Sequence, residues 1–232
     1  MKNKSEIVAI IPARGNSKSI PRKNLAKIRG IPMINYTIKE AKKCKLIDRI
    51  ICSTENKEIA NIAKKAGAEV PFLRPKSLSR DNSHTAEVIY HAVKFLEKKN
   101  IKIKLVVILQ ATSPLRKTKY ISDSIKKIIS KNYASVVTVT KAYPPWWTFT
   151  AKKNKLKQSL TLKNIDAFNL ERQQLPPAYK CNGAVYVTKR RFIKPNTCFN
   201  VKNCGYVYMK EKDSYDVDTY EDLLKIKKII EN

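Results

Sequence analysis

Long apolar runs are absent from this sequence of 232 residues. No run approaches the roughly 20 residues that a membrane-spanning helix needs. The first residues, MKNKSE, also lack the apolar core of a signal peptide. We therefore expect a protein that does not enter the membrane and that resides in the cytoplasm.

Cysteine and histidine are also scarce. The five cysteines form no CxxC pair, which argues against a zinc knuckle, and their odd number argues against a disulfide framework. Two histidines, His84 and His91, are present without an evident third ligand, so a histidine metal site is not expected. The prediction is a set of reduced, mostly packed thiols.

Acidic residues are few: 19 Asp and Glu stand against 48 Lys and Arg, for a formal net charge of +29. Such an excess usually indicates nucleic acid, an anionic surface or an anionic substrate as the partner. No single basic tail or arm is present, and much of the charge is lysine at helix-face positions. A basic nucleic-acid-binding protein is therefore the alternative from another class, and small anionic substrates are favoured over it.

What the sequence does contain is an alternation of apolar strands and amphipathic helices. The expected strands are 7–11, 48–54, 69–73, 105–109, 136–139 and 206–209. The expected helices are 32–43, 57–66 closed by Gly67, 86–98, one that ends near 129, and one capped by Thr219. This order predicts βαβ units with a parallel sheet, and the length fits a single domain over residues 1–232.

The stretch 7–24, IVAIIPARGNSKSIPRKN, joins the first strand to a cationic loop. The loop's four cations are Arg14, Lys18, Arg22 and Lys23. Small residues let backbone N–H groups approach a ligand, and the cations can neutralise a polyphosphate. The loop is neither a Walker motif nor a dinucleotide fingerprint, because Gly15 is its one glycine. A solvated basic loop is the alternative that these residues leave open.

Polar side chains follow two other strands. The run LVVIL at 105–109 leads directly into QATSPLR at 110–116, and the polar loop 74–85 follows the short strand before it. Ligands of open α/β sheets bind outside the carboxyl ends of the strands. Both segments are therefore predicted at the binding edge, although Asp81, Thr85, Thr112 and Ser113 could also be helix caps.

Two carboxylates, Asp216 and Asp218, stand two residues apart near the C-terminus. Residues i and i+2 of an extended segment point the same way, so these two can converge on one hard cation such as Mg²⁺. Such a pair is common by chance. It gains weight from the cationic phosphate loop in the same chain.

The residue composition changes at 141–147, KAYPPWW, where both tryptophans lie in a segment stiffened by two prolines. An aromatic cluster of this kind typically marks an interface or a lid over a ligand. The run RQQLPPAYKCNGAVYV follows at 172–187. Its first residue, Arg172, has a guanidinium, a group that suits a carboxylate because it makes two parallel hydrogen bonds to it.

Four ordered motifs together resemble those of the CMP-sugar synthetases, the cytidylyltransferases that activate sialic acid and related acidic sugars. They are ARxxSKxxPxKN at 13–24, LQxTSPLR at 109–116, RQxLPxxYxxNGAxY at 172–186, and DxDT at 216–219. The resemblance implies a Rossmann-like three-layer α/β sandwich of the nucleotide-diphospho-sugar transferase type. It also implies transfer of CMP from CTP to the anomeric hydroxyl of an acidic nine-carbon (nonulosonic) sugar, with release of pyrophosphate.

The resemblance also implies roles for single residues. The implied catalytic groups are Arg14, Lys18, Lys23 and Asp218, and the implied metal ligands for Mg²⁺, or Mn²⁺ in its place, are Asp216 and Asp218. The nucleotide is assigned to Ala13, Gly15, Asn16, Ser17, Asn24, Arg74 and Thr85. The sugar is assigned to Gln110, Thr112, Ser113, Arg116, Arg172, Lys180, Asn182 and Tyr186. No histidine or glutamate of the motifs is an evident general base.

The resemblance further implies a homodimer in which the excursion 141–180 crosses to the second subunit and completes its sugar pocket. Three residues depart from the family pattern: Ser19 replaces a common glycine, Trp147 a lysine, and Lys180 an arginine. The last two fall in the sugar pocket, so legionaminic-, pseudaminic- and other acylneuraminate-like sugars stay open beside N-acetylneuraminate. A synthetase for the eight-carbon 3-deoxy-octulosonate sugar is the enzyme alternative, against which LQxTSPLR and RQxLP argue.

Overall fold

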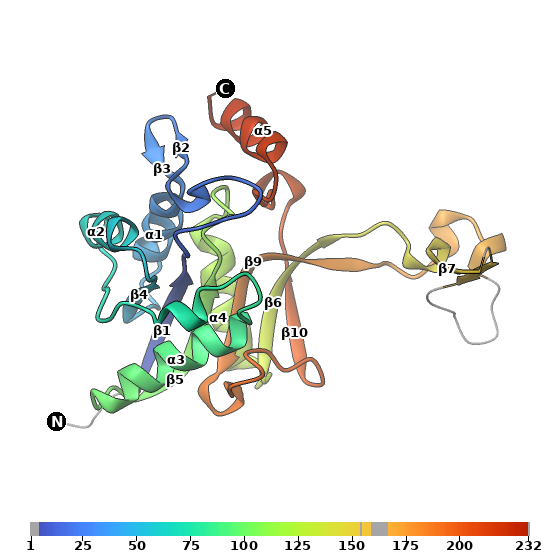
Figure 1. The fold of residues 1–232 in the computed structure, drawn as a ribbon. Coiled ribbons are helices and arrows are strands. Elements are labelled where there is room, and N and C mark those ends of the chain that lie inside the picture. The colour runs from blue at the N-terminus through green and yellow to red at the C-terminus, as the bar shows by residue number, and fades with distance from the viewer. Residues whose placement is uncertain (1–4, 154, 159–166, 232) are drawn as a thin grey trace.

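A six-stranded sheet forms the centre of the computed structural model, which describes residues 5–153, 155–158 and 167–231 (Figure 1). In spatial order the strands are β10 (Cys204–Tyr208), β6 (Ser135–Lys141), β9 (Tyr179–Lys189), β5 (Ile103–Leu109), β1 (Glu6–Pro12) and β4 (Arg49–Ser53). Among these six described strands, β9 alone runs antiparallel to its neighbours, β5 and β6. The predicted mostly parallel α/β sheet is confirmed.

Helices cover the sheet on both sides. Helices α1 (Met33–Lys43), α2 (Lys57–Ala66) and α4 (Thr118–Ser130) pack on one face, and α3 (Thr85–Lys98) packs on the other. Along β1, Ala9 and Ile11 belong to the first core, and Val8 and Ile10 belong to the second. Successive strand residues point to opposite faces, so β1 is buried on both sides as its apolar sequence predicts. The result is the expected three-layer sandwich.

Two predicted helix ends are confirmed at atomic detail. Helix α2 ends at Gly67, whose φ of 99° is a left-handed conformation that glycine adopts without strain. Helix α5 (Tyr220–Glu231) is capped by Thr219: its Oγ1 accepts from the Asp222 backbone N–H at 3.2 Å, and Asp222 Oδ2 accepts from the Thr219 N–H at 2.8 Å.

The predicted strand over 69–73 is wrong beyond its first residue. Glu69 forms a single parallel bridge with Ile51, and no strand continues from it in this described segment. Pro71 explains the break, since proline has no N–H to donate to a ladder. The sequence reading also missed the small hairpin of β2 (Lys27–Ile28) and β3 (Ile31–Pro32).

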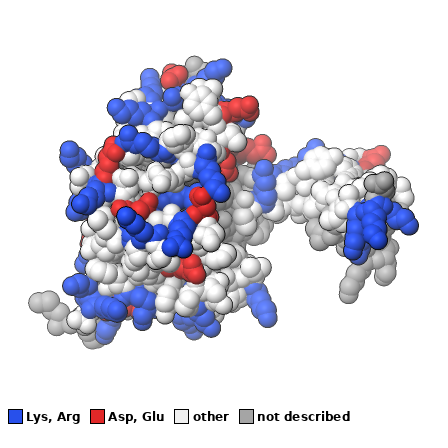
Figure 2. Space-filling model, in the orientation of Figure 1, with Lys and Arg blue, Asp and Glu red and all other residues white. Residues whose placement is uncertain are grey.

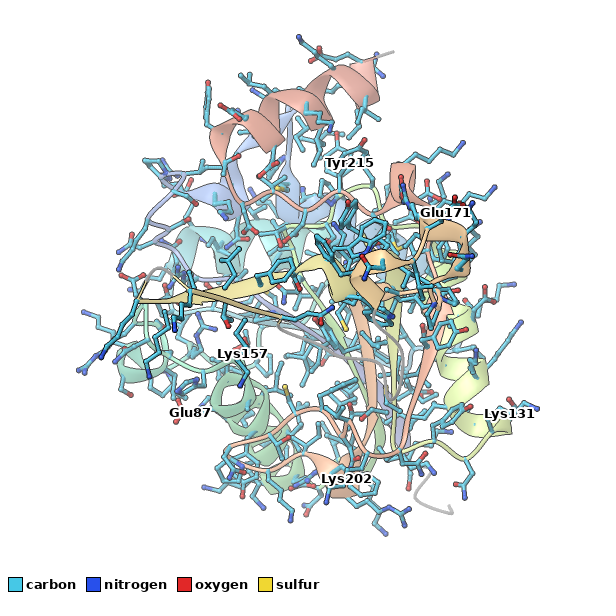
Figure 3. All side chains as sticks on the ribbon, turned by 90° about the vertical axis from the view of Figure 1, so that its right-hand side faces the viewer. Glu87, Lys131, Lys157, Glu171, Lys202 and Tyr215 are labelled. Atoms are coloured by element: carbon cyan, nitrogen blue, oxygen red, sulfur yellow. The ribbon has the colours of Figure 1, made fainter. Side chains whose placement is uncertain are left out.

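The segment between β6 and β9 leaves the body as a long arm (Figure 1). It contains the hairpin of β7 (Phe149–Lys152) and β8 (Lys155–Gln158), and part of the predicted excursion 141–180 lies outside the described residues. The arm exposes large apolar side chains: Leu156 is 70% exposed and Phe168 60%. Figure 3 looks from the side of the arm and shows Lys157 and Glu171 on it. The arm thus holds exposed apolar side chains away from the body, together with exposed lysines of β7 and β8.

A third, smaller core joins the phosphate loop to the C-terminal segment. It contains Ile20 of the loop, Met33 of α1, Val217 of the DxDT motif, and Leu223 and Ile226 of α5. This packing brings the cationic loop and the two aspartates to the same end of the molecule. In Figure 3, Tyr215 lies toward this end and Lys202 lies at the opposite end. Among the described residues, no helix is both long and apolar enough to cross a bilayer.

Candidate active site

A cavity of about 330 Å³ lies at the carboxyl ends of β1 and β5. Its walls come from the phosphate loop, the 74–85 loop and residues 110–112, and Asp218 lines it as well. Basic side chains, with acidic ones between them, gather around a hollow on the face shown in Figure 2. The three segments that the sequence predicts at the binding edge therefore meet around one cavity.

Four cationic side chains line the cavity: Arg14, Lys23, Arg74 and Arg80. A carboxylate, Asp81, faces two cations of the phosphate loop. Its Oδ1 lies 2.9 Å from Arg14 Nη1, and its Oδ2 lies 3.3 Å from Lys18 Nζ. Asp81 thus makes an anionic contact to cations that are predicted to hold a triphosphate.

Lys23 connects the phosphate loop to the two aspartates. Its Nζ donates to the Val217 carbonyl oxygen at 2.9 Å and lies 3.4 Å from Asp218 Oδ1. The lysine side chain is 11% exposed, whereas that of Asp218 is 77% exposed. A mostly buried ammonium therefore lies next to a carboxylate that solvent and ligands can reach.

The residues assigned to the nucleotide divide into two groups. Ser17, Asn24, Arg74 and Thr85 line the cavity, whereas Ala13, Gly15, Asn16 and also Lys18 lie outside its lining. Ala13 is 1% exposed, and its N–H donates to the Ser53 carbonyl at 3.0 Å. Asn24 Nδ2 donates to the Arg14 carbonyl oxygen at 2.9 Å, so this amide holds the loop while the residue also lines the cavity.

Glu55, which sequence reasoning missed, lies behind the cavity wall. Its Oε1 accepts from the Gly15 N–H at 2.6 Å, and its Oε2 lies 2.9 Å from Arg74 Nη2. Burial alone would raise the pKa of the Glu55 carboxyl, but the hydrogen bonds from Gly15 and from its own backbone, together with Arg74, lower it overall. Glu55 comes two residues after β4, so the rule that ligands gather at strand ends could have found it.

The two aspartates lie in different surroundings. Asp216 is half-buried, and its Oδ1 accepts from Ser113 Oγ at 3.2 Å. Burial raises the pKa of the Asp216 carboxyl, and the nearby charge of Asp218 raises it further, against the lowering effect of hydrogen bonds from Thr112 and Ser113. Each aspartate therefore lies within the electrostatic reach of the other.

The donor set at the aspartates fits a magnesium ion. Within the described part of the chain, no cluster of three or more His, Cys, Asp or Glu side chains could hold a metal by itself. Mg²⁺ is usually bound through one or two carboxylates plus substrate phosphates and water, and not by a complete protein cage. Asp216 and Asp218 beside a cationic cavity match that pattern.

Two residues of the LQxTSPLR motif take supporting positions. Ser113 is fully buried, and Arg116 is 1% exposed. The Arg116 guanidinium donates to the carbonyl oxygens of Gln110 and Ala184 at 3.0 and 2.8 Å, and to Thr37 Oγ1 at 2.6 Å. Arg116 is thus buried and not in the sugar contact implied by the resemblance, because both of its Nη groups donate to the fold. Its Nε is buried without a hydrogen-bond partner among the described residues.

The remaining residues of that motif face the cavity or hold its neighbours. Gln110 and Thr112 line it, and the Thr112 carbonyl oxygen accepts from the Val217 N–H at 2.8 Å. The alternative that Thr112 or Ser113 caps the next helix is wrong, because α4 begins at Thr118. Thr85 is likewise the first residue of α3 and not its cap, which is His84.

The other residues assigned to the sugar do not gather at this cavity. Asn182 Oδ1 accepts from Thr138 Oγ1 at 2.7 Å, and its Nδ2 donates to Ser214 Oγ at 3.0 Å. Tyr186 packs edge-on against Phe199, with ring centroids 5.7 Å apart. Lys180 is exposed at the start of β9. Their side chains are distributed along β9.

Arg172 lies on the arm. Its guanidinium lies 5.8 Å from the centroid of the Tyr143 ring. Arg172 also lines a separate pocket of the arm with residues 141, 142, 144, 173 and 175–178. The arm extends from the body on the side of β6 and β9 (Figure 1). The candidate for binding the sugar carboxylate is therefore remote from the phosphate cavity within one chain.

Comparison with known proteins gives a consistent set of relatives. Residues 8–231 match the family described as "Cytidylyltransferase". The chain is 28% identical to the CMP-N,N'-diacetyllegionaminic acid synthase of Legionella pneumophila, over 97% of this chain and 96% of that protein. It is 31% identical to the pseudaminic acid cytidylyltransferase of Campylobacter jejuni, over 93% of this chain and 92% of that one.

A solved structure has a similar fold at lower sequence identity. It is a CMP:2-keto-3-deoxy-manno-octonic acid synthetase complexed with CTP. The alignment covers 98% of this chain and 99% of that one, with a TM-score of 0.70 and 14% identity. At this identity the likeness establishes the fold.

Proposed function

This chain belongs to the cytidylyltransferase family, and from that premise we propose that it transfers CMP from CTP to the anomeric hydroxyl of a nonulosonic acid and releases pyrophosphate. One observation carries the proposal: a cavity lined by Arg14, Lys23 and Arg74 adjoins the carboxylates of Asp216 and Asp218. Cations for a triphosphate and oxygen ligands for a divalent metal are the two requirements of nucleotidyl transfer.

The acceptor is proposed to be a sugar of the legionaminic or pseudaminic type. Relatives named for these two sugars match nearly the full length of this chain. In addition, Trp147 and Lys180 replace residues that are common in the sialic-acid enzymes it resembles. The eight-carbon sugar of the structural neighbour is less well supported, because that likeness is one of fold at 14% identity.

In the proposed mechanism, Arg14 and Lys23 bind the triphosphate and stabilise the departing pyrophosphate, as preorganised cations do. Asp216 and Asp218 supply the carboxylate ligands for Mg²⁺ or Mn²⁺. A divalent metal held there would offset negative charge that develops on the attacking and leaving oxygens during in-line attack at the α-phosphorus. Ser113 fixes the rotamer of Asp216 through the 3.2 Å hydrogen bond, so this ligand is oriented before the substrates arrive.

The test is pyrophosphate release from CTP, ATP, GTP and UTP with Mg²⁺, against a panel of acidic sugars. The panel contains legionaminic, pseudaminic, N-acetylneuraminic and 3-deoxy-octulosonic acids. We expect release from CTP with legionaminic or pseudaminic acid, and little from the other nucleotides. Release that is fastest with the eight-carbon sugar, or none with any sugar from folded protein, would contradict the proposal.

We further propose that the arm completes the sugar site of a second copy of the chain. Within one chain, Arg172 is remote from the cavity, and the arm exposes the apolar residues Leu156 and Phe168. Large exposed apolar patches typically become covered in an assembly. A symmetric dimer would place each arm on its partner, and Arg172 could then reach the sugar carboxylate.

Subunit mixing tests the shared site. The variants R172A and D218N are each expected to be almost inactive, because one lacks the sugar contact and the other lacks the metal ligand. When the two variants are mixed, unfolded and refolded together, half of the dimers would be heterodimers. Each heterodimer would have one intact site out of two, so the mixture would show roughly a quarter of the wild-type activity. Mixtures that stay as inactive as the parents would show that Arg172 does not act across a dimer.

Replacing Asp81 by asparagine is expected to strengthen nucleotide binding. The carboxylate bonds to Arg14 and Lys18 and would repel the phosphates that approach them. Because the pairs are partly exposed, the expected decrease in the Kd for CTP is modest, about threefold. Isothermal titration calorimetry measures it, with D123N as the control, since Asp123 lies on α4 away from the cavity. A higher Kd in D81N would mean that Asp81 supports the nucleotide.

A further inference from the structure

Glu55 joins two walls of the nucleotide cavity that are far apart in sequence. One oxygen accepts from the Gly15 N–H of the phosphate loop at 2.6 Å, and the other contacts Arg74 Nη2 of the 74–85 loop at 2.9 Å. The Glu55 side chain is 18% exposed and the Arg74 side chain is 3% exposed. A single carboxylate therefore lies between the loops and is largely withdrawn from solvent.

Both partners of Glu55 are held from other sides as well. Gly15 packs closely against Asn56, since a Cβ added at Gly15 would lie 2.8 Å from Asn56 Nδ2. Asn56 is itself held, because its Oδ1 accepts from the Glu58 and Ile59 backbone N–H groups in the first turn of α2. Arg74 donates through Nε to Ser79 Oγ at 3.0 Å, and its backbone N–H donates to the Thr54 carbonyl oxygen at 2.8 Å. Glu55 thus completes an arrangement in which each loop has one defined position.

We propose that Glu55 is a positioning residue for the nucleotide, which it serves by holding Arg74 at the cavity wall and the phosphate loop at a fixed distance from it. This inference rests on the proposed function, because it takes CTP to be the ligand of this cavity. The buried Arg74 guanidinium needs a counter-charge to remain withdrawn from water. Without Glu55, Arg74 would turn toward solvent, and the Gly15 N–H would lose its acceptor.

The contacts of Glu55 distinguish two residues that were predicted to bind the nucleotide, Gly15 and Arg74. The Gly15 N–H is directed to Glu55 and is not available to a phosphate, whereas Arg74 still lines the cavity. The loop therefore presents Arg14 and Lys23 as its charged groups, and the backbone at Gly15 sets their spacing. Loss of Glu55 should disturb nucleotide binding more than the chemical step.

The variant E55Q keeps the shape of the side chain and removes its charge. We expect the KM for CTP to rise about tenfold while kcat and the KM for the sugar change less than about twofold, since binding is lost equally in ground and transition states. The control is E69Q. Glu69 also accepts from an arginine, Arg49 of β4, at 2.6 Å, but it lies outside the cavity lining, so wild-type kinetics are expected.

A double-mutant cycle tests whether Glu55 acts through Arg74. If it does, E55Q combined with R74K will raise the KM for CTP hardly more than R74K alone. If E55Q does not fold, E55D takes its place; it keeps the charge on a shorter side chain, and we expect a rise of about threefold. Three results would overturn the role of Glu55: a wild-type KM for CTP in E55Q, a loss of kcat as large as the rise in KM, or additive effects of E55Q and R74K. In each case, CTP turnover by the wild type would still uphold the proposed function. No turnover by the wild type would contradict both.

Discussion

Replacing Asp218 by asparagine is expected to lower kcat by at least about 10²-fold, because it removes a negatively charged oxygen ligand from the proposed metal site. Asp218 is 77% exposed, so its carboxylate is free to meet a metal–nucleotide complex. Its ion pair with Lys23 is long, at 3.4 Å, and the Asp218 carboxylate in this pair is open to solvent. Stability should therefore change little while activity is lost.

The measurement is the initial rate of pyrophosphate release at increasing Mg²⁺ concentrations, together with thermal unfolding of the same preparation. The matched control is E221Q, since Glu221 is an exposed carboxylate in the first turn of α5, three residues further along the chain. We expect wild-type rates for the control. Retained activity in D218N would contradict the metal assignment. The alternative of a basic nucleic-acid-binding protein predicts that D218N has little effect, because such binding depends on phosphate contacts.

Replacing Arg116 by methionine is expected to destabilise the fold by about 3 kcal/mol, as expected when buried acceptors lose a charged donor. The side chain is 1% exposed, and it satisfies the carbonyl oxygens of Gln110 and Ala184 and the hydroxyl of Thr37. Burial lowers the pKa of Arg116 to about 10, against the opposing charges of Glu40 and Asp216. This shift reflects a cation that is costly to bury and is held by its hydrogen bonds.

Urea unfolding measures the change in free energy, with R191M as the control because Arg191 is exposed beside Phe192. The control should stay within about 0.5 kcal/mol of the wild type. R116K tests the geometry: it keeps the charge, but one ammonium cannot reach all three acceptors, so we expect an intermediate loss. Equal stability of R116M and the wild type would mean that Arg116 is not a structural residue, and a direct sugar contact would again be the better interpretation.

The sequence was sufficient to predict five of the six strands of the sheet and the position of the cavity. Strand β9, which lies inside the sheet and runs antiparallel, was not among the expected strands. Apolar runs that end in polar residues predicted β1 and β5, and the rule for strand ends placed the phosphate loop beside Gln110 and Thr112. The aspartate pair was predicted as a metal site that acts with the phosphate loop, and the small core around Val217 brings the two together. These features depend on local patterns and on simple topology.

Other features depend on contacts that a linear pattern does not contain. Arg116 belongs to a motif of ligand-facing residues, and its sequence does not reveal whether it points to the ligand or beneath it. Glu55 stands in an ordinary strand-end segment, and its role appears once Gly15 and Arg74 are seen on either side of it. The strand predicted over 69–73 fails because Pro71 cannot join the ladder.

We propose that the remaining part of the site comes from a second copy of the chain. Arg172 was predicted as the residue that binds the carboxylate, and a single chain places it on the arm, beside Tyr143. Neither the sequence nor one chain fixes where an arm of this kind ends in an assembly. The subunit-mixing experiment addresses this point directly, because it requires one residue from each copy.

The most direct test of the proposed reaction follows the oxygen of the sugar. The acceptor found in the sugar panel is labelled with ¹⁸O at its anomeric hydroxyl, and the products with CTP are analysed by mass spectrometry. If that hydroxyl attacks the α-phosphorus, the label will remain in the CMP-sugar and none will enter pyrophosphate. Unlabelled CMP-sugar, with the ¹⁸O lost to water, or CMP formed without a sugar attached, would contradict the account.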